Sequence, residues 1–344
     1  MTSNSHLYLY AILIAAGTSF LLVPLVRQAA IRFGWIDRPA SAVKTHKLPT
    51  PSLGGVAIWV GFEVSLIVIR LMTTFPSGTL RSLRAVVVGS FVVFILGVID
   101  DVRKPSGLNV RAKFTGQTVA AALLIWYGMK IDFITPQYLA TALTVLWIVG
   151  ICNAFNIIDI MDGLCATQAI VAAAAFLLIE LPSEQVYVNV ASAALLGAAL
   201  GYLPWNFSED RKIFMGDSGS MTLGFVLAAV SLGTSYSRVN PLGVYAPLFI
   251  LLVPMYDTFY VMIIRLRKGL SPFMGSKDHF ALRLEALGFN RHQIVALSTM
   301  AAALLSVCAF IITRVAWQWS LIIYAVLVAE IALLSRAISR IEVK

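Results

Sequence analysis

The chain has 344 residues, of which 59% are hydrophobic and 12% charged, and its net charge is +9. Soluble domains carry roughly 25% charged residues, so this composition, with a mean hydropathy of +0.85, indicates an integral membrane protein. The basic residues stand in short loops between apolar segments, a pattern typical of membrane surfaces and phosphate ligands rather than nucleic acid. The three cysteines are scattered and form no C-x-x-C pair, so neither a disulfide framework nor a zinc site is indicated.

A membrane span needs about 20 mostly apolar residues. The sequence offers eleven candidates without a long polar insertion, so residues 1–344 are predicted to form one all-α membrane domain, a bundle of about 11 transmembrane helices. The first candidate has no basic leader and no clear cleavage site, and we expect a retained span there. The candidates cover residues 7–27, 53–72, 84–99, 114–130, 138–155, 164–181, 187–204, 218–235, 244–265, 294–314 and 319–338.

Lys and Arg divide unevenly between the two sets of alternating loops. One set holds 20 of the 26 basic residues and the other holds six. The richer side is predicted to be cytoplasmic, which puts the N-terminus outside and the C-terminus inside a cytoplasmic (inner) membrane. Nearly all the polar motifs that could bind a ligand or take part in catalysis lie on this same side, so we expect an active site at the cytoplasmic face.

The stretch NAFNIIDIMDGL, residues 153–164, places a polar residue at every third position. A helix turns about 100° per residue, so side chains at every third position do not line up. They cover a broad part of the helix surface, like a polar wall, rather than a narrow stripe. Polar side chains at the end of a membrane helix need water, a partner or an ion. A solvated helix end is the ordinary alternative to a ligand site. The four residues are Asn153, Asn156, Asp159 and Asp162.

Two further motifs place carboxylates beside apolar runs. Asp100 and Asp101 end the run VVFILGVIDD, with Lys104 and Lys113 nearby. Adjacent carboxylates repel one another, which is costly unless cations neutralise their charge. Asp217 stands in IFMGDSGS before another span, as a hard-cation ligand or as a simple helix cap. The helix start after it is expected to offer N–H groups to an anion.

Two loops add basic residues. HKLPTPSLGG, residues 46–55, contains Lys47, two stiffening prolines and a Gly pair. His279 and Arg283 are spaced i, i+4, so in a helix both could face one ligand. The oxygen, amide and cationic groups of all these motifs together suit Mg²⁺ and phosphates. No P-loop or GxGxxG motif is present.

In combination these motifs resemble the polyprenyl-phosphate N-acetylhexosamine-1-phosphate transferases, a group of glycosyltransferase family 4 type. NAFNIIDIMDGL is similar to that family's NAxNxxDGxDGL motif. The other matching segments are IDD at 99–101, GLNVRAKFTGQ at 107–117, IFMGDSGS at 213–220 and the PTPSLGG loop. The resemblance implies a membrane bundle of ten or eleven helices with a cytoplasmic active site. It also implies transfer of a sugar 1-phosphate from a UDP-sugar to a polyprenyl phosphate such as undecaprenyl phosphate, release of UMP, and a need for Mg²⁺ or Mn²⁺.

The resemblance assigns a role to each matched residue. Asp100 and Asp101 match the catalytic aspartate pair near the lipid phosphate, and Asp217 with Asn156 match metal-binding positions. The positions implied to contact substrate are Lys47, Lys113, Asn153, Asp159, Asp162, Phe214, His279 and Arg283; Phe214 matches a position that stacks on uracil.

This sequence also departs from the family pattern. Ile160 replaces the usual Gly, and the fifth loop reads DHFALRL, where His279 alone remains of a histidine-rich motif. The missing histidines argue against a muramyl-pentapeptide donor and favour UDP-N-acetylglucosamine, as in the first membrane step of a cell-envelope glycan pathway. A homodimer is compatible with the sequence, which does not decide the oligomeric state.

Two other classes of membrane protein remain alternatives. A transporter would place polar residues in mid-span at interrupted helices, whereas here they gather on one side. A phosphatidyl-alcohol transferase would need a DGxxAR pattern, but Leu164 to Thr167 follow Asp162-Gly163 here.

Overall fold

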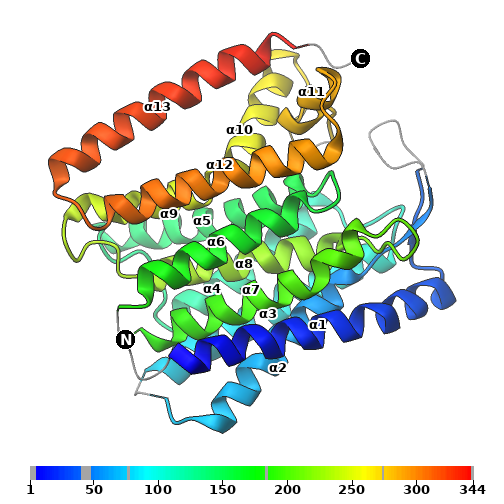
Figure 1. The fold of residues 1–344 in the computed structure, drawn as a ribbon, viewed down its shortest axis with the longest axis horizontal. Helices are drawn as coiled ribbons and strands as arrows, with labels where there is room; N and C mark the ends of the chain where they lie inside the picture. The colour runs from blue at the N-terminus through cyan, green and yellow to red at the C-terminus, as the bar shows by residue number, and fades with distance from the viewer. Residues whose placement is uncertain (1–4, 40–47, 76–77, 183–184, 273–274, 342–344) are drawn as a thin grey trace.

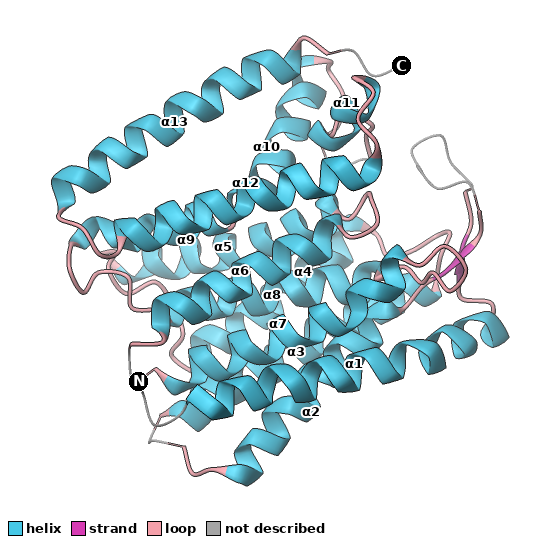
Figure 2. Cartoon of the chain, in the orientation of Figure 1, coloured by secondary structure: helices cyan, strands magenta, loops and turns pink. Residues whose placement is uncertain are grey.

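The structure is a computed structural model that describes residues 5–39, 48–75, 78–182, 185–272 and 275–341. Their regular structure is helical apart from one short antiparallel strand pair, as Figure 2 shows, which confirms the predicted all-α class. The elements in chain order are α1 (Ser5–Phe33), β1 (Ile36–Asp37), β2 (Thr50–Pro51), α2 (Gly54–Met72), α3 (Thr79–Val102), α4 (Val110–Trp126), α5 (Gln137–Ile158), α6 (Leu164–Glu180), α7 (Val186–Phe207), α8 (Gly216–Gly233), the 3-10 helix η1 (Pro241–Tyr245), α9 (Ala246–Ile250), α10 (Leu252–Arg267), α11 (Phe280–Ala286), α12 (Arg291–Ile312) and α13 (Trp317–Ser339).

Each predicted span falls on a helix or, for residues 244–265, mostly on the broken run from η1 to α10. Among the described residues, seven helices are long and apolar enough to cross a membrane. The run Pro241–Ile250 with α10 makes an eighth if its 69° bend lies within one span. The count of eleven stays a prediction, because α4 and α6 have 17 residues and α8 has 18, fewer than the roughly 20 of a full span.

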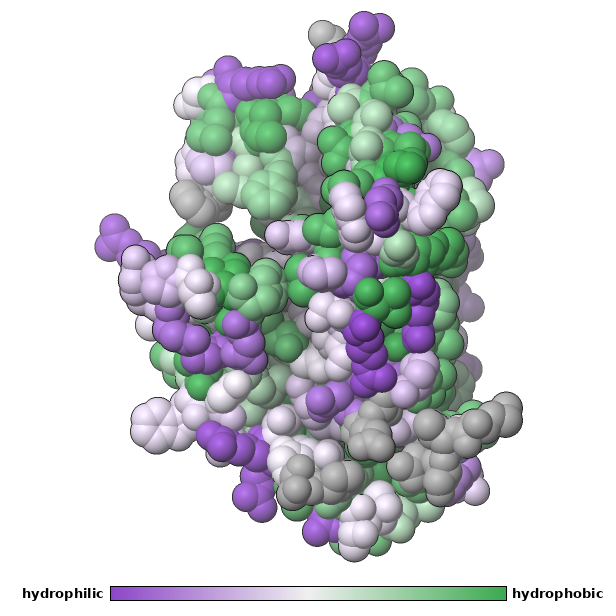
Figure 3. Space-filling view, turned by 90° about the vertical axis from the view of Figure 1, so that its left-hand side faces the viewer, coloured by the Kyte–Doolittle hydropathy of each residue, from purple (hydrophilic) through white to green (hydrophobic). Residues whose placement is uncertain are grey.

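Most helices lie side by side, and α13 leaves the bundle at an angle (Figure 1). Helix α1 begins at the left of that view, while α13 ends at the right, on the side of the β1–β2 pair. Figure 3 shows the left-hand end of the bundle, where hydrophilic and hydrophobic residues are mixed across the face. The orientation of these ends in a membrane stays a prediction.

Helix α8 forms the centre of the bundle and packs against α2, α3, α5, α6 and α7. Nearly all of its side chains are buried. Small residues allow this close packing, as is common between membrane helices. A Cβ on Gly55 would lie 2.1 Å from the amide nitrogen of Gly219, and one on Gly97 would lie 2.4 Å from the Cα of Ser218. Helices α2 and α3 therefore meet the first turn of α8 backbone to backbone, and this contact positions the site.

Gly55→Ala should destabilise the protein, because its methyl group would push α2 away from α8. Overpacking of this kind costs about 1–3 kcal/mol, which would lower the midpoint of thermal unfolding in detergent. Gly17→Ala in α1 is the matched control, since a Cβ there would meet nothing within 4 Å. Equal midpoints for the two variants would contradict the close contact.

Candidate active site

The end of α3 is bound to the start of α8 through Asp101. Its carboxylate accepts the backbone N–H of Asp217 and that of Ser218, each at 3.0 Å. The N–H groups expected to receive an external anion are therefore already occupied, and that expectation is corrected. Gly216 permits this approach because its φ is +72° and a Cβ would lie 2.4 Å from a carboxylate oxygen of Asp101.

Three carboxylates and two ammonium groups form the centre of the site. Oxygens of Asp100, Asp101 and Asp217 all lie within 4.8 Å of one another. The Lys104 Nζ lies 2.7 Å from Asp101 Oδ1 and 3.5 Å from Asp217 Oδ1. The Lys113 Nζ lies 3.0 Å from Asp100 Oδ1 and also contacts Asp217. The lysines thus offset most of the repulsion that the aspartates would otherwise exert on one another.

The segment after α3 delivers both lysines to the carboxylates. Burial alone would lower the pKa of the Lys104 ammonium, but Asp217 and Asp101 outweigh it and raise that pKa well above its ordinary value. The backbone N–H of Leu108 donates to Asp100 at 2.6 Å, which folds the loop onto the cluster. Asn109 then caps α4 by accepting the N–H of Ala112 at 2.8 Å, so Lys113 stands in the first turn of that helix.

The PTPSLGG loop lies against the IFMGDSGS segment, as expected if both belong to one site. Phe214 donates its backbone N–H to Pro51 at 2.8 Å and accepts that of Gly54 at 2.9 Å. The N–H of Gly55 continues the pairing to the carbonyl of Met215 at 2.9 Å. Lys47 lies outside the described residues, and its assignment stays a prediction.

Asn153 and Asn156 are held by the helices that carry the charged cluster. The Asn153 amide donates to Gln117 of α4 and to the Val149 carbonyl, both at 2.7 Å. The Asn156 amide donates at 3.0 Å to the hydroxyl of Ser220, one turn after Asp217 in α8. Since each –NH₂ group is engaged within the protein, the carbonyl oxygens are the ends left to accept from a ligand or bind a cation.

The loop between α5 and α6 carries the two aspartates of the motif. Asp162 pairs with Lys212 at 2.6 Å. Burial raises the pKa of Asp159 to about 7, although the positive charge of Lys104 acts to lower that pKa. Gly163 has a φ of +80°, and a Cβ there would lie 2.1 Å from the Phe207 ring. Its N–H donates at 2.5 Å to Asn206 of α7. Only glycine fits this turn, which therefore fixes both aspartates.

His279 and Arg283 do not share a face as expected. His279 immediately precedes α11, and its ring contacts Asp257 of α10. The Arg283 guanidinium lies 3.2 Å from Asp278, contacts the carbonyl of Ile341 and stacks on a tyrosine ring. The role of Arg283 in substrate binding stays a prediction.

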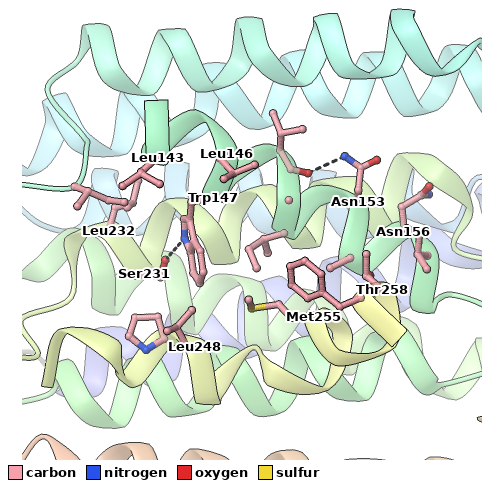
Figure 4. A pocket seen from close by; sticks show the side chains of 18 of the residues that line it. Leu143, Leu146, Trp147, Asn153, Asn156, Ser231, Leu232, Leu248, Met255 and Thr258 are labelled. Carbon is pink, nitrogen blue, oxygen red and sulfur yellow. Dashed lines mark hydrogen bonds between the residues drawn. The ribbon is translucent and has the colours of Figure 1, made fainter. Parts of the chain in front are cut away.

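A large cavity adjoins the charged cluster. Its volume is about 1520 Å³, and its lining follows α5 from residues 130–135 to Ile160. Figure 4 shows Asn153 and Asn156 near one end and apolar side chains along the rest. Lys113 and His279 also line it. The apolar residues labelled there are Leu143, Leu146, Trp147, Leu232, Leu248 and Met255.

Comparison with known proteins identifies the family. Residues 83–235 match glycosyl transferase family 4. A protein of Bacillus subtilis named "probable undecaprenyl-phosphate N-acetylglucosaminyl 1-phosphate transferase" is 30% identical over 92% of this chain and 88% of its own length. The chain belongs to glycosyl transferase family 4.

Other relatives agree with this membership. The decaprenyl-phosphate N-acetylglucosaminephosphotransferase of Mycolicibacterium smegmatis is 32% identical over 83% of this chain and 77% of its own. The undecaprenyl-phosphate alpha-N-acetylglucosaminyl 1-phosphate transferase of Escherichia coli K12 is 28% identical over 83% and 78%. The region matched to glycosyl transferase family 4 contains the aspartate cluster and the α5–α6 loop but ends before His279 and Arg283.

The donor groups fit a divalent metal ion. Carboxylate and amide oxygens are the ligands that Mg²⁺ prefers, and the described residues place three carboxylates within 4.8 Å. Asn156 of α5 donates to the hydroxyl of Ser220, which lies one turn along α8 from Asp217. Asp217 and Asn156 are therefore suitable ligands from neighbouring helices.

Three contributors were given no role among the predicted site residues. Lys104 was named as a cation near the aspartate pair, which it follows by three residues. Gln117 and Lys212 contact the site only through tertiary packing, at Asn153 and Asp162. No spacing in the sequence connects those pairs.

Proposed function

We propose that this protein transfers N-acetylglucosamine 1-phosphate from UDP-N-acetylglucosamine to a polyprenyl phosphate and releases UMP. The observation that carries the proposal is the junction of the aspartate–lysine cluster with the apolar cavity. One end suits phosphates and the other suits a hydrocarbon chain, which are the two parts of a lipid phosphate. The names of the relatives support the same acceptor and sugar.

The cavity is suited to the prenyl chain of the acceptor. It exceeds the roughly 300–1,000 Å³ of ordinary small-molecule pockets. Helix α5, which it follows, has 22 residues and so spans about 33 Å, close to the thickness of a bilayer core. Burial of a prenyl chain there is favourable at about 25 cal/mol per Å². Lys113 at the polar end would meet the lipid phosphate.

In the proposed reaction, an oxygen of the lipid phosphate attacks the β-phosphorus of the UDP-sugar. The bond between that phosphorus and the UMP oxygen breaks, and a lipid diphosphate sugar forms. A phosphate monoester has a second pKa near 6, so the acceptor is largely a dianion at neutral pH and needs no strong base. Asp100 would position the acceptor beside Lys113.

Mg²⁺, or Mn²⁺ in its place, would be held by Asp217 and Asn156 and would stabilise negative charge on the phosphoryl oxygens. Lys104 and Lys113 supply further positive charge at the same place. Asp159 and Asp162 would contact the nucleotide, and Phe214 would stack on uracil.

The released nucleotide distinguishes this reaction from ordinary glycosyl transfer. Attack at phosphorus leaves UMP, whereas attack at the anomeric carbon would leave UDP. We expect purified protein with undecaprenyl phosphate and UDP-N-acetylglucosamine to form UMP, and added UMP to regenerate the UDP-sugar from the product lipid. Chromatography of the nucleotides measures both. Stoichiometric UDP without UMP would refute the proposal.

Asp217→Asn should lower activity by about 100-fold or more, since it removes a charged metal ligand and weakens stabilisation of the transition state. The thermal unfolding midpoint and the initial rate at several Mg²⁺ concentrations are the measurements. Asp210→Asn, in the exposed segment before α8, is the control and should match the unaltered protein. Full activity of folded Asp217→Asn in ordinary Mg²⁺ would remove Asp217 from the metal site.

The catalytic face should be cytoplasmic, given the excess of basic residues on that side. On a cysteine-free background, an impermeant thiol reagent should label Ser106→Cys and Asp210→Cys only after cells are opened. Val239→Cys, in the exposed loop after α8, should react in intact cells. The reverse pattern would invert the proposed topology.

A further inference from the structure

Asp257 is a buried carboxylate in α10 that the aspartate–lysine cluster does not include. Its side chain is 0% exposed. Asp257 Oδ2 lies 2.7 Å from His279 Nδ1, and Oδ1 accepts the backbone N–H of Phe280 at 3.0 Å. A buried charge is costly unless it is paired and hydrogen-bonded, and here both oxygens meet the start of α11.

The imidazole separates this carboxylate from the cavity. His279 lines the cavity together with Lys113 and Asn156, whereas Asp257 does not. Because the carboxylate accepts from Nδ1, that nitrogen carries a proton and Nε2 is the ring nitrogen available to a ligand.

The charged residues next to His279 pair with one another rather than with Asp257. Asp278, next in the chain, pairs with Lys268 at 2.8 Å and with Arg283 at 3.2 Å. Asp257 is thus the acidic partner of His279.

We propose that Asp257 is a positioning residue for the transfer reaction, holding the His279 ring by Nδ1 so that Nε2 faces the phosphate of the lipid acceptor. The inference rests on the proposed function for the identity of that phosphate. The acceptor is favoured over the UDP-sugar because His279 lines the apolar cavity, where the prenyl chain would lie. Asp257 touches neither substrate.

Asp257→Asn separates this role from simple capping of α11. The asparagine carbonyl can still accept the N–H of Phe280, so a structural cap survives. Its –NH₂ group would then donate to Nδ1, which removes the proton there and reverses the tautomer of the His279 ring. A positioning role predicts a loss of function in this variant, and a capping role predicts none.

The test measures the KM of each substrate for Asp257→Asn, His279→Gln and the double variant. We expect each single variant to raise the KM for undecaprenyl phosphate by about 10-fold, with little change in the KM for UDP-N-acetylglucosamine. The double variant should be no worse than His279→Gln, because Asp257 acts through that ring. Glu285→Gln, a change on α11 at a partly exposed carboxylate that pairs with Arg291, is the control. Normal kinetics of Asp257→Asn, or equal losses for both substrates, would overturn the proposal.

A spectroscopic measurement keeps the proposal testable if a variant does not fold. The chain has only four histidines, so ¹⁵N-histidine NMR can assign the His279 ring. The unaltered protein should carry a proton on Nδ1, and an unprotonated Nδ1 would refute the pairing. If the unaltered protein released no UMP, the proposed function would fail while the NMR result would still decide the pairing.

Discussion

The contact between the Asp101 carboxylate and the first turn of α8 is the interaction on which the site depends. A helix N-terminus favours an anion, and this buried carboxylate satisfies two N–H groups there. It ties α3 to α8 and thereby brings Asp100 beside Asp217. Three carboxylates so close together require cations, which explains why Lys104 and Lys113 reach into the same place.

The cluster and the apolar cavity reinforce one another. Electrostatic interactions strengthen where water is excluded by apolar walls, so charges at the end of such a cavity act strongly on a bound phosphate. The same walls would hold a hydrocarbon chain. A transporter would be expected to place its binding groups at the midplane, whereas this cluster lies where α3 ends and α8 begins.

The spacing of polar residues in 153–164 predicted the arrangement of only part of this stretch. The polar wall was expected on one helix, but α5 ends at Ile158. Asn153 and Asn156 therefore stand on the helix, while Asp159 and Asp162 lie in the turn fixed by Gly163. The four residues still border one site, because neighbouring helices and the Lys212 segment supply their partners.

By itself the sequence determined the all-α membrane class, the positions of the helices and the motifs that identify the family. These depend on hydrophobic runs and short spacings, which are local properties. Only the tertiary structure decided that Asp101 occupies the start of α8, 116 residues away, and that Asp257 supports His279 across 22 residues. The contacts of Arg283 with Asp278 and with the end of the chain are likewise tertiary. So is the bend in the run from η1 to α10. Such partners are chosen by packing between helices, and no periodicity along the chain encodes which helix ends will meet.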